Sequence, residues 1–371
     1  MINNTNRIMS NALEMPELTC FEDLVRETRL SANLIYWLSK KDAKGKYRTF
    51  YIDKSNGKKR EINAPVGSLK ILQRWVLEEI LYKIKPSKYA YGFKKGENGS
   101  PIFRCAEKHK NNTYLLKLDL KSFYPSIKRE RIFYEFVNIG YNSRVANLLT
   151  NICSLKDSLP QGAVTSAFLA NLICFKLDAR IAGYCNKRNI TYTRYADDLA
   201  FSGNDRDLLR NIFGMIKRIV EDEGFQLNDK KTMFMTPKNH KLLLGVTINN
   251  DRTKASKEVK RRIRAMIHYS MVTGDYSLNE RIRGYISYIN SIEDDYRKNC
   301  IDYINKLTQS SLSLFDEIVE EYNKNKLFKE LPNMKVKNPS DFVKQSEVDN
   351  FMSDLYYERR EFLIKHGIYE D

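Results

Sequence analysis

The alternation of hydrophobic and polar residues predicts a β-strand that ends close to an aspartate. Leucines occupy every second position along residues 114–120, which is the period of a half-buried strand, and Asp119 lies on the opposite face near its end. Residues rich in β-formers also flank Tyr195-Ala196-Asp197-Asp198 on both sides. This pattern predicts a β-hairpin with Asp197 and Asp198 at its tip.

A turn and a helix are predicted between these two aspartate sites. The turn is Leu159-Pro160-Gln161-Gly162, and apolar residues follow it at helical spacing. These apolar positions are Phe168, Leu169, Leu172, Ile173, Leu177 and Ile181. Taken singly, each feature has an ordinary structural explanation, since Gly-rich turns often precede helices and an Asp-Asp turn is usually solvated. Their order along the chain is the informative observation.

The three aspartates suggest metal-dependent chemistry on phosphates. Adjacent carboxylates in a tight turn converge on one point, where they repel each other unless cations neutralise them. Hard divalent ions such as Mg²⁺ prefer oxygen ligands and bridge to substrate phosphates, which is the chemistry of polymerases. Asp119 would add a third carboxylate if its strand pairs with the hairpin.

In this order the motifs resemble those of the reverse transcriptases, and the resemblance extends from about Tyr47 to Gly284. It implies an α+β fold with the right-hand architecture of polymerases: fingers, a palm of antiparallel sheet plus helices, and a helical thumb. It also implies that Asp119, Asp197 and Asp198 are catalytic and hold two Mg²⁺ ions. Lys231, in the segment Gly224–Thr232, matches a lysine near the departing pyrophosphate and is a candidate general acid.

The same resemblance indicates residues that bind the incoming deoxynucleotide. Arg60 and, as second choice, Lys58 match the basic fingers hairpin that clamps the triphosphate, and arginine suits this task because it bonds phosphate oxygens in a bidentate way. For Lys58 a solvated basic turn is an equally good explanation. The other positions carried over to the nucleotide site are Leu120, Tyr124, Gln161 and Gly162. Among them, Tyr124 falls where the family has a bulky gate that excludes a 2′-hydroxyl.

Within this family the chain is most similar to the bacterial retron enzymes, which are compact and have no fused nuclease domain. Cys105-Ala106-Glu107-Lys108-His109 stands where retrons carry Asn-Ala-x-x-His, and Leu243-Leu244-Gly245 where they carry Val-Thr-Gly. His109 either contacts RNA or is a hydrogen-bonded structural histidine. The resemblance implies DNA synthesis from a 2′-hydroxyl of a guanosine in a cognate structured non-coding RNA. The product would be RNA-linked DNA, and the enzyme would act beside a separate effector protein in anti-phage defence.

The charge of the chain agrees with a nucleic-acid partner. Its 63 Lys+Arg against 46 Asp+Glu give a net charge of +17, which suits a phosphate backbone. Residues 257–307 have a basic helical pattern with interleaved aromatics, and we expect Tyr285 and Ile289 to lie in its core. The predicted phosphate contacts in this region are Lys260, Arg261, Arg264, Arg281 and Arg283.

We expect four parts along the chain: an N-terminal helical segment (1–45), fingers and palm (46–250), a helical thumb (251–310) and a C-terminal helical extension (311–371). A linker at 331–339 and a terminal helix at 340–366 are predicted within the last part. The six cysteines have no Cys-x-x-Cys spacing, which favours free thiols in a cytoplasmic protein. The sequence has neither a membrane-spanning apolar run nor a signal peptide, so no membrane partner is expected.

Two other functions are compatible with parts of this pattern. One is a defence-associated reverse transcriptase of another lineage, with untemplated or protein-primed DNA synthesis, which would not depend on a cognate RNA. The other is an RNA-binding, maturase-like protein without catalysis. The presence of Asp119, Asp197, Asp198 and Gln161 argues against the second alternative, because RNA binding does not require three carboxylates beside a phosphate backbone.

Overall fold

The computed structural model describes residue 8 and residues 12–41, 43–53, 57–94, 99–249 and 252–309. The fold is α+β with antiparallel sheets, as predicted. Two compact units divide the chain, the first ending at Lys254 and the second beginning at Ala255. The predicted linker, terminal helix and extension after residue 310 lie outside the described residues, and the division into four parts stays a prediction.

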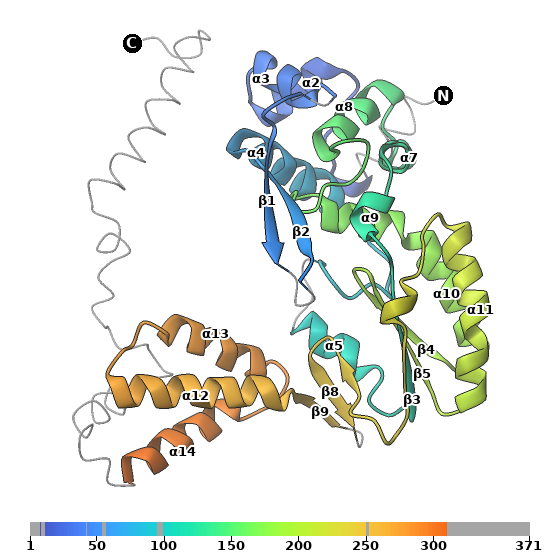
Figure 1. Ribbon diagram of the computed structural model, residues 1–371. Coiled ribbons are helices and arrows are strands. Elements are labelled where there is room, and N and C mark those ends of the chain that lie inside the picture. Colours follow the sequence, from blue (N-terminus) through green and yellow to red (C-terminus); the bar gives the residue numbers. More distant parts are fainter. Residues whose placement is uncertain are drawn as a thin grey trace. The chain divides into compact units, whose positions relative to one another are not determined.

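A four-stranded antiparallel sheet forms the centre of the first unit. Its strands lie in the order β4 (Thr191–Tyr195), β5 (Asp198–Gly203), β3 (Tyr114–Asp119) and β6 (Met233–Met235). Two helices, α10 (Phe175–Asn186) and α11 (Arg206–Asp222), lie side by side along this sheet and contact its strands (Figure 1). Both the predicted strand at 114–120 and the predicted hairpin around Asp197 are therefore confirmed.

The helices that precede and surround the sheet pack mainly on one another. Their bounds are α2 (Phe21–Thr28), α3 (Ala32–Ser39), α4 (Gly67–Trp75), α7 (Arg129–Ile139) and α8 (Ser143–Cys153). Helices α3, α4 and α7 each contact α8. Helices α2 and α3 lie in the N-terminal segment that was predicted to be helical, and the side chain of Ser31 caps α3 by accepting a hydrogen bond from the Leu34 N–H at 3.3 Å.

A two-stranded ribbon stands beside these helices. It consists of β1 (Tyr47–Asp53) and β2 (Lys59–Pro65), which pair along their whole length (Figure 1). The predicted Pro-Gln-Gly turn packs against β2, since the Asn63 N–H donates to the Gln161 carbonyl at 2.8 Å. Gly162 has φ +120°, and a Cβ there would lie 2.9 Å from both the Asn63 oxygen and Ile62 Cγ2. This turn can therefore contain only glycine at 162 without local displacement.

The helix predicted after this turn is two helices. The first, α9 (Ser166–Ile173), ends at Cys174, where α10 begins. Short elements complete the unit: η1 (Val76–Ile80), η2 (Leu81–Lys83), α5 (Pro101–Glu107), α6 (Phe123–Ser126), η3 (Asp229–Lys231), β7 (Leu242–Leu243), β8 (Val246–Asn249) and β9 (Arg252–Ala255). Strands β7, β8 and β9 form a small sheet of their own.

The second unit contains α12 (Lys257–Thr273), α13 (Asn279–Asn290) and α14 (Tyr296–Gln309). Ile289 is buried in its core, as expected. Tyr285 is not, and this expectation was wrong: the ring is half-buried, and hydrogen bonds from Arg262 and Arg281 lower the pKa of its hydroxyl. The hydroxyl group of Tyr285 is therefore bonded to arginines of α12 and α13 and does not lie in the hydrophobic core.

The cysteines and the helices bear on the kind of protein that this chain is. All six cysteines are free, as predicted, and five of them are buried. Within the described residues, the helices are too short or too polar to cross a membrane.

Gly162 offers a test of the packing between the turn and the ribbon. We expect Gly162→Ala to destabilise the protein by about 1–3 kcal/mol, because its φ is positive and its Cβ would meet backbone. Gly183→Ala in α10 is the matched control: its Cβ would meet nothing within 4 Å. That change should stabilise by about 0.5–1 kcal/mol. Urea unfolding of both variants measures the difference, and equal effects would contradict the close packing at Gly162.

Candidate active site

Three aspartates meet at one end of the central sheet. Asp119 is the last residue of β3 and pairs directly with Asp198, the first residue of β5. The Leu120 N–H donates to the Asp197 carbonyl at 2.9 Å, which joins the end of β3 to the hairpin turn. The structure therefore brings together the three residues that the sequence predicted as catalytic, although they lie in two distant segments.

Negative charge is concentrated at this point. Burial, followed by the neighbouring charge of Asp197, raises the pKa of Asp198 to about 6. Burial, together with the charge of Asp119, also raises the pKa of Asp197. Lys231 balances part of this charge: its Nζ lies 2.5 Å from Asp119 Oδ2, and this hydrogen bond raises the pKa of the lysine. Asn228 holds the other oxygen of Asp119 with its Nδ2 at 3.1 Å.

This donor set fits a divalent metal ion, although the described residues contain no closed cluster of three acidic, histidine or cysteine side chains. Asp119 is itself engaged by Lys231, whose Nζ donates to its Oδ2. Three carboxylates are the oxygen ligands that Mg²⁺ prefers. Burial, more than the neighbouring negative charges, raises the pKa values of Asp197 and Asp198, so a bound cation would favour their ionised forms.

Two of the predicted nucleotide-binding residues lie near these aspartates. Arg60 is exposed on β2, and its positive charge lowers the pKa of Asp197 and of Tyr124 against larger effects that raise them. Tyr124 is half-buried in α6, where burial and then the charge of Asp197 raise its pKa to about 12. Lys58 is exposed immediately before β2.

The remaining predicted nucleotide-binding positions differ in what they can offer. Gln161 and Gly162 form the turn that packs on β2. Leu120 is 1% exposed, so its side chain belongs to the core, and its N–H is already bonded to Asp197. Leu120 could therefore affect nucleotide binding only by fixing the position of the backbone beside Asp197.

His109 is the predicted RNA contact that the geometry does not support. The ring is completely buried, with Nδ1 2.6 Å from Ser202 Oγ and Nε2 2.7 Å from Thr193 Oγ1. Thr193 and Ser202 belong to β4 and β5, the two strands of the aspartate hairpin. His109 thus fastens the end of the α5 segment to the back of this hairpin, which is the structural alternative left open by the sequence.

The basic residues of the second unit fall into two groups. Arg261, Arg264, Arg281 and Arg283 are exposed on α12 and α13, and their predicted phosphate contacts stay a prediction. Lys260 is half-buried, and its Nζ forms an ion pair of 2.7 Å with Glu293. Because its charge is matched inside the unit, the geometry argues against a phosphate contact at Lys260.

The sequence analysis missed a buried ion pair behind the hairpin. Arg194 on β4 and Asp178 on α10 are both 0% exposed, and the Nε and Nη2 of the arginine each donate to the carboxylate at 2.8 Å. Nη1 donates to Asn171 Oδ1 at 2.9 Å and to the Ala196 carbonyl at 3.2 Å. Ala196 has a left-handed φ of +55°, immediately before Asp197. One signal was available: Asp178 interrupts the apolar face formed by Leu177 and its helical neighbours.

Comparison with known proteins places the chain in a family. Residues 52–248 match the family model described as reverse transcriptase (RNA-dependent DNA polymerase). The chain is 36% identical over 306 residues to the retron Ec86 reverse transcriptase of Escherichia coli, covering 82% of this chain and 93% of that protein. It is 32% identical over 268 residues to the retron Mx65 reverse transcriptase of Myxococcus xanthus, covering 67% and 62%. The chain therefore belongs to the reverse transcriptase family and, within it, to the retron reverse transcriptases.

It is thus an RNA-dependent DNA polymerase, a class whose substrates are template RNA and dNTPs and which typically uses divalent metal ions. Among solved structures, the chain is similar to a telomerase from Candida albicans in complex with a fragment of telomeric RNA, with a TM-score of 0.43 and 12% sequence identity. That similarity covers 83% of this chain and 66% of the telomerase chain.

His109 should make the stability of the protein sensitive to pH. Burial lowers the pKa of the His109 imidazole to about 3, well below its ordinary value of 6.5. Below about pH 6.5 the unfolded chain binds a proton that the folded chain does not, so the stability contributed by His109 is lost as the pH falls from about 6.5 towards 3. Between about pH 6.5 and 5.5 this loss amounts to about 1 kcal/mol.

Thermal unfolding at several pH values measures this loss. His109→Gln should flatten the pH dependence in that window, because glutamine does not titrate. His240→Gln is the control, since His240 is exposed, and it should leave the wild-type dependence in place. The same slope in both variants would contradict a neutral buried His109.

The buried pair should be one of the most sensitive contacts in the molecule. We expect Arg194→Ala to cost about 3–5 kcal/mol, because Asp178 is left as an uncompensated buried charge. Arg26→Ala, which removes an exposed pair with Asp23, should change the stability far less, because solvent screens an exposed pair. The double variant Arg194→Met/Asp178→Leu removes both charges and should recover part of the stability. We expect this double variant to extend primers more slowly than the wild type, because the Ala196 carbonyl no longer has Arg194 as its hydrogen-bond donor. Activity at the wild-type level would contradict the role of Arg194 in positioning the turn.

Proposed function

We propose that this protein makes branched, RNA-linked single-stranded DNA from a cognate structured non-coding RNA, starting at a 2′-hydroxyl of a guanosine. The observation that carries the proposal is the meeting of Asp119, Asp197 and Asp198 in a chain that is 36% identical to a retron enzyme over 82% of its length. A role in anti-phage defence, in the cytoplasm and beside a separate effector protein, follows from the same kinship.

The proposed active site divides its work among a few side chains. Asp119, Asp197 and Asp198 would hold two Mg²⁺ ions. When bound, these ions would supply activation of the primer hydroxyl and neutralisation of charge on the triphosphate. Arg60, with Lys58 beside it, would hold the phosphates of the incoming nucleotide from β2. Lys231, whose Nζ already lies 2.5 Å from Asp119, would give a proton to the departing pyrophosphate.

Selection of deoxynucleotides is assigned to Tyr124. Its half-buried ring is held against Phe123, with ring centroids 5.3 Å apart, and its pKa responds to the charge of Asp197. A rigid ring close to the catalytic carboxylates is suited to exclude a 2′-hydroxyl. Phe123 is only 5% exposed and packs on Phe225, so it is a core residue instead.

The carboxylates provide the first test of this function. Asp198→Asn should abolish DNA synthesis on a primed RNA template with Mg²⁺ and dNTPs while the protein stays folded, because the change removes a metal ligand and relieves repulsion. Asp294→Asn is the matched control: it makes the same chemical change outside the proposed site and should leave activity unchanged. Activity of the Asp198→Asn variant at the wild-type level would remove Asp198 from the site.

The RNA bound by the protein provides the second test. Protein expressed from its native locus is purified, and the nucleic acid that accompanies it is sequenced and examined for covalently linked DNA. We expect one structured RNA with DNA attached through a 2′-branch. DNA without linked RNA, made by a protein that is active alone, would instead support untemplated or protein-primed synthesis.

A further inference from the structure

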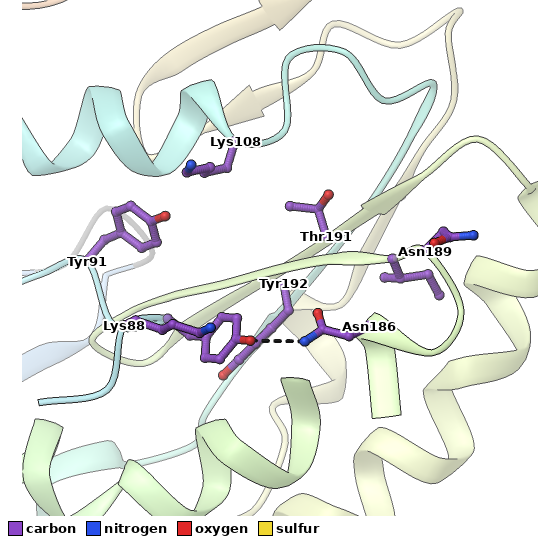
Figure 2. A pocket seen from close by; sticks show the side chains of 9 residues that line it. Lys88, Tyr91, Lys108, Asn186, Asn189, Thr191 and Tyr192 are labelled. Carbon is purple, nitrogen blue, oxygen red and sulfur yellow. Dashed lines mark hydrogen bonds between the residues drawn. The ribbon is translucent and has the colours of Figure 1, made fainter. Parts of the chain in front are cut away.

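A polar cavity of about 640 Å³ opens beside β4, the edge strand of the central sheet (Figure 2). Three separate segments line it: residues 88–91, Lys108 just after α5, and residues 186–192 at the start of β4. Of the lining residues on β4, Tyr192 lies furthest along the strand, three positions before its last residue, Tyr195. The cavity is therefore about 10 Å along β4 from the turn that carries Asp197. It is thus separate from the aspartates.

The lining combines cations with aromatic rings. Lys88 and Lys108 are both exposed, and among the described residues that line the cavity none is acidic. Figure 2 shows Lys108 on one side of the cavity, Lys88 and Asn186 on the other, and Tyr91 at one end between them. The two lysines can therefore approach one bound anion from opposite sides.

The tyrosines are held in place before any ligand arrives. The hydroxyl of Tyr89 accepts a hydrogen bond from Asn186 Nδ2 at 3.0 Å, and Lys88 Nζ lies 5.2 Å from the centre of the Tyr89 ring. The rings of Tyr89 and Tyr192 are 5.8 Å apart. Tyr91 is half-buried, and its ring has Lys94 Nζ at 5.9 Å. A preorganised site loses less conformational entropy on binding.

Each part of this lining matches a part of a nucleotide. Lysines attract phosphates, the half-buried ring of Tyr91 can stack with a base, and the exposed amide of Asn186 can bond a base edge or a 2′-hydroxyl. The volume lies within the range of about 300–1,000 Å³ found for small-molecule sites, which is enough for a nucleotide unit. No lining carboxylate is available to hold the metal ions of a triphosphate, so an incoming dNTP is a poor match.

We propose that this cavity binds an unpaired nucleotide of the RNA that the enzyme carries, at a subsite distinct from the polymerase site. The inference rests on the proposed function in so far as the RNA is the cognate one. The chemistry itself needs only a single-stranded RNA segment, and RNA-binding proteins commonly recognise unpaired bases in loops and bulges. An RNA bound here is anchored to the same strand that carries the catalytic turn.

The test measures binding of a short oligouridylate to the full-length protein whose polymerase site is already occupied by a template–primer duplex. Lys88→Gln/Lys108→Gln should reduce the salt dependence of binding, lowering the slope of log K against log salt by about 0.7, because the two lysines approach one phosphate and each phosphate contacted on a single strand contributes about 0.7. The matched control is Lys70→Gln/Lys156→Gln, which removes the same charge from exposed lysines outside the cavity. It should leave the slope unchanged.

Tyr91→Leu separates stacking from charge. It should weaken oligouridylate binding by about tenfold with no change in salt slope, as expected for the loss of one stacked base. Thiouridine placed in the oligonucleotide should crosslink to residues 88–91 or 186–192. Equal slopes in the two lysine variants, or crosslinks elsewhere only, would overturn the subsite. Displacement of the RNA by an acidic peptide with undiminished affinity in Tyr91→Leu would assign the cavity to a protein partner and overturn it as well.

These outcomes are independent of the proposed function. Recovery of unbranched DNA from the native locus, with oligouridylate still crosslinked in the cavity, would count against branched synthesis and leave the subsite standing. Recovery of branched DNA with no crosslink in the cavity would support branched synthesis and overturn the subsite.

Discussion

The buried ion pair between Arg194 and Asp178 is the contact on which the hairpin that carries Asp197 and Asp198 depends. Neither side chain has any exposed surface, so neither charge is solvated and each requires the other. Because Arg194 lies on β4 and Asp178 on α10, the pair joins the sheet to the helix packed on it. The same guanidinium bonds the Ala196 carbonyl, in the left-handed residue that leads the chain into Asp197. The position of Asp197 is therefore set from the helical layer as well as by the turn.

The opposite electrostatic condition holds at the end of the hairpin that carries the aspartates. There the aspartates repel one another, burial raises the pKa of Asp198 to about 6, and Lys231 compensates only part of the charge. Carboxylates that repel each other stay close only if the backbone beneath them is held firmly. Arg194 supplies one restraint, and His109, bonded to Thr193 and Ser202, supplies another across both strands. A well-satisfied interior thus supports a site whose own charges are left for ligands to neutralise.

The sequence predicted those parts of the molecule in which local pattern and chemistry agree. The strand before Asp119 and the hairpin around Asp197 both follow from periodicity or turn chemistry within a few residues. The meeting of Asp119 with Asp198 follows once their strands are paired. The break at Cys174 and the buried state of His109 did not follow, because both depend on which surfaces pack together, and the periodicity of a single segment does not contain that information.

The roles of the charged residues are the least predictable from the local sequence pattern, because their partners lie elsewhere in the chain. Arg194, Lys260 and Lys231 are all cations in regions expected to handle nucleic acid, and each has its carboxylate partner far along the chain, at separations of 16, 33 and 112 residues. Arg194 is fully buried with its partner, and Lys260 is mostly covered beside Glu293, so both serve the fold. Lys231 is 59% exposed, and its partner Asp119 is a proposed metal ligand. Among these three cations it is therefore the one whose side chain is exposed beside the aspartates, which no count of basic residues would have distinguished.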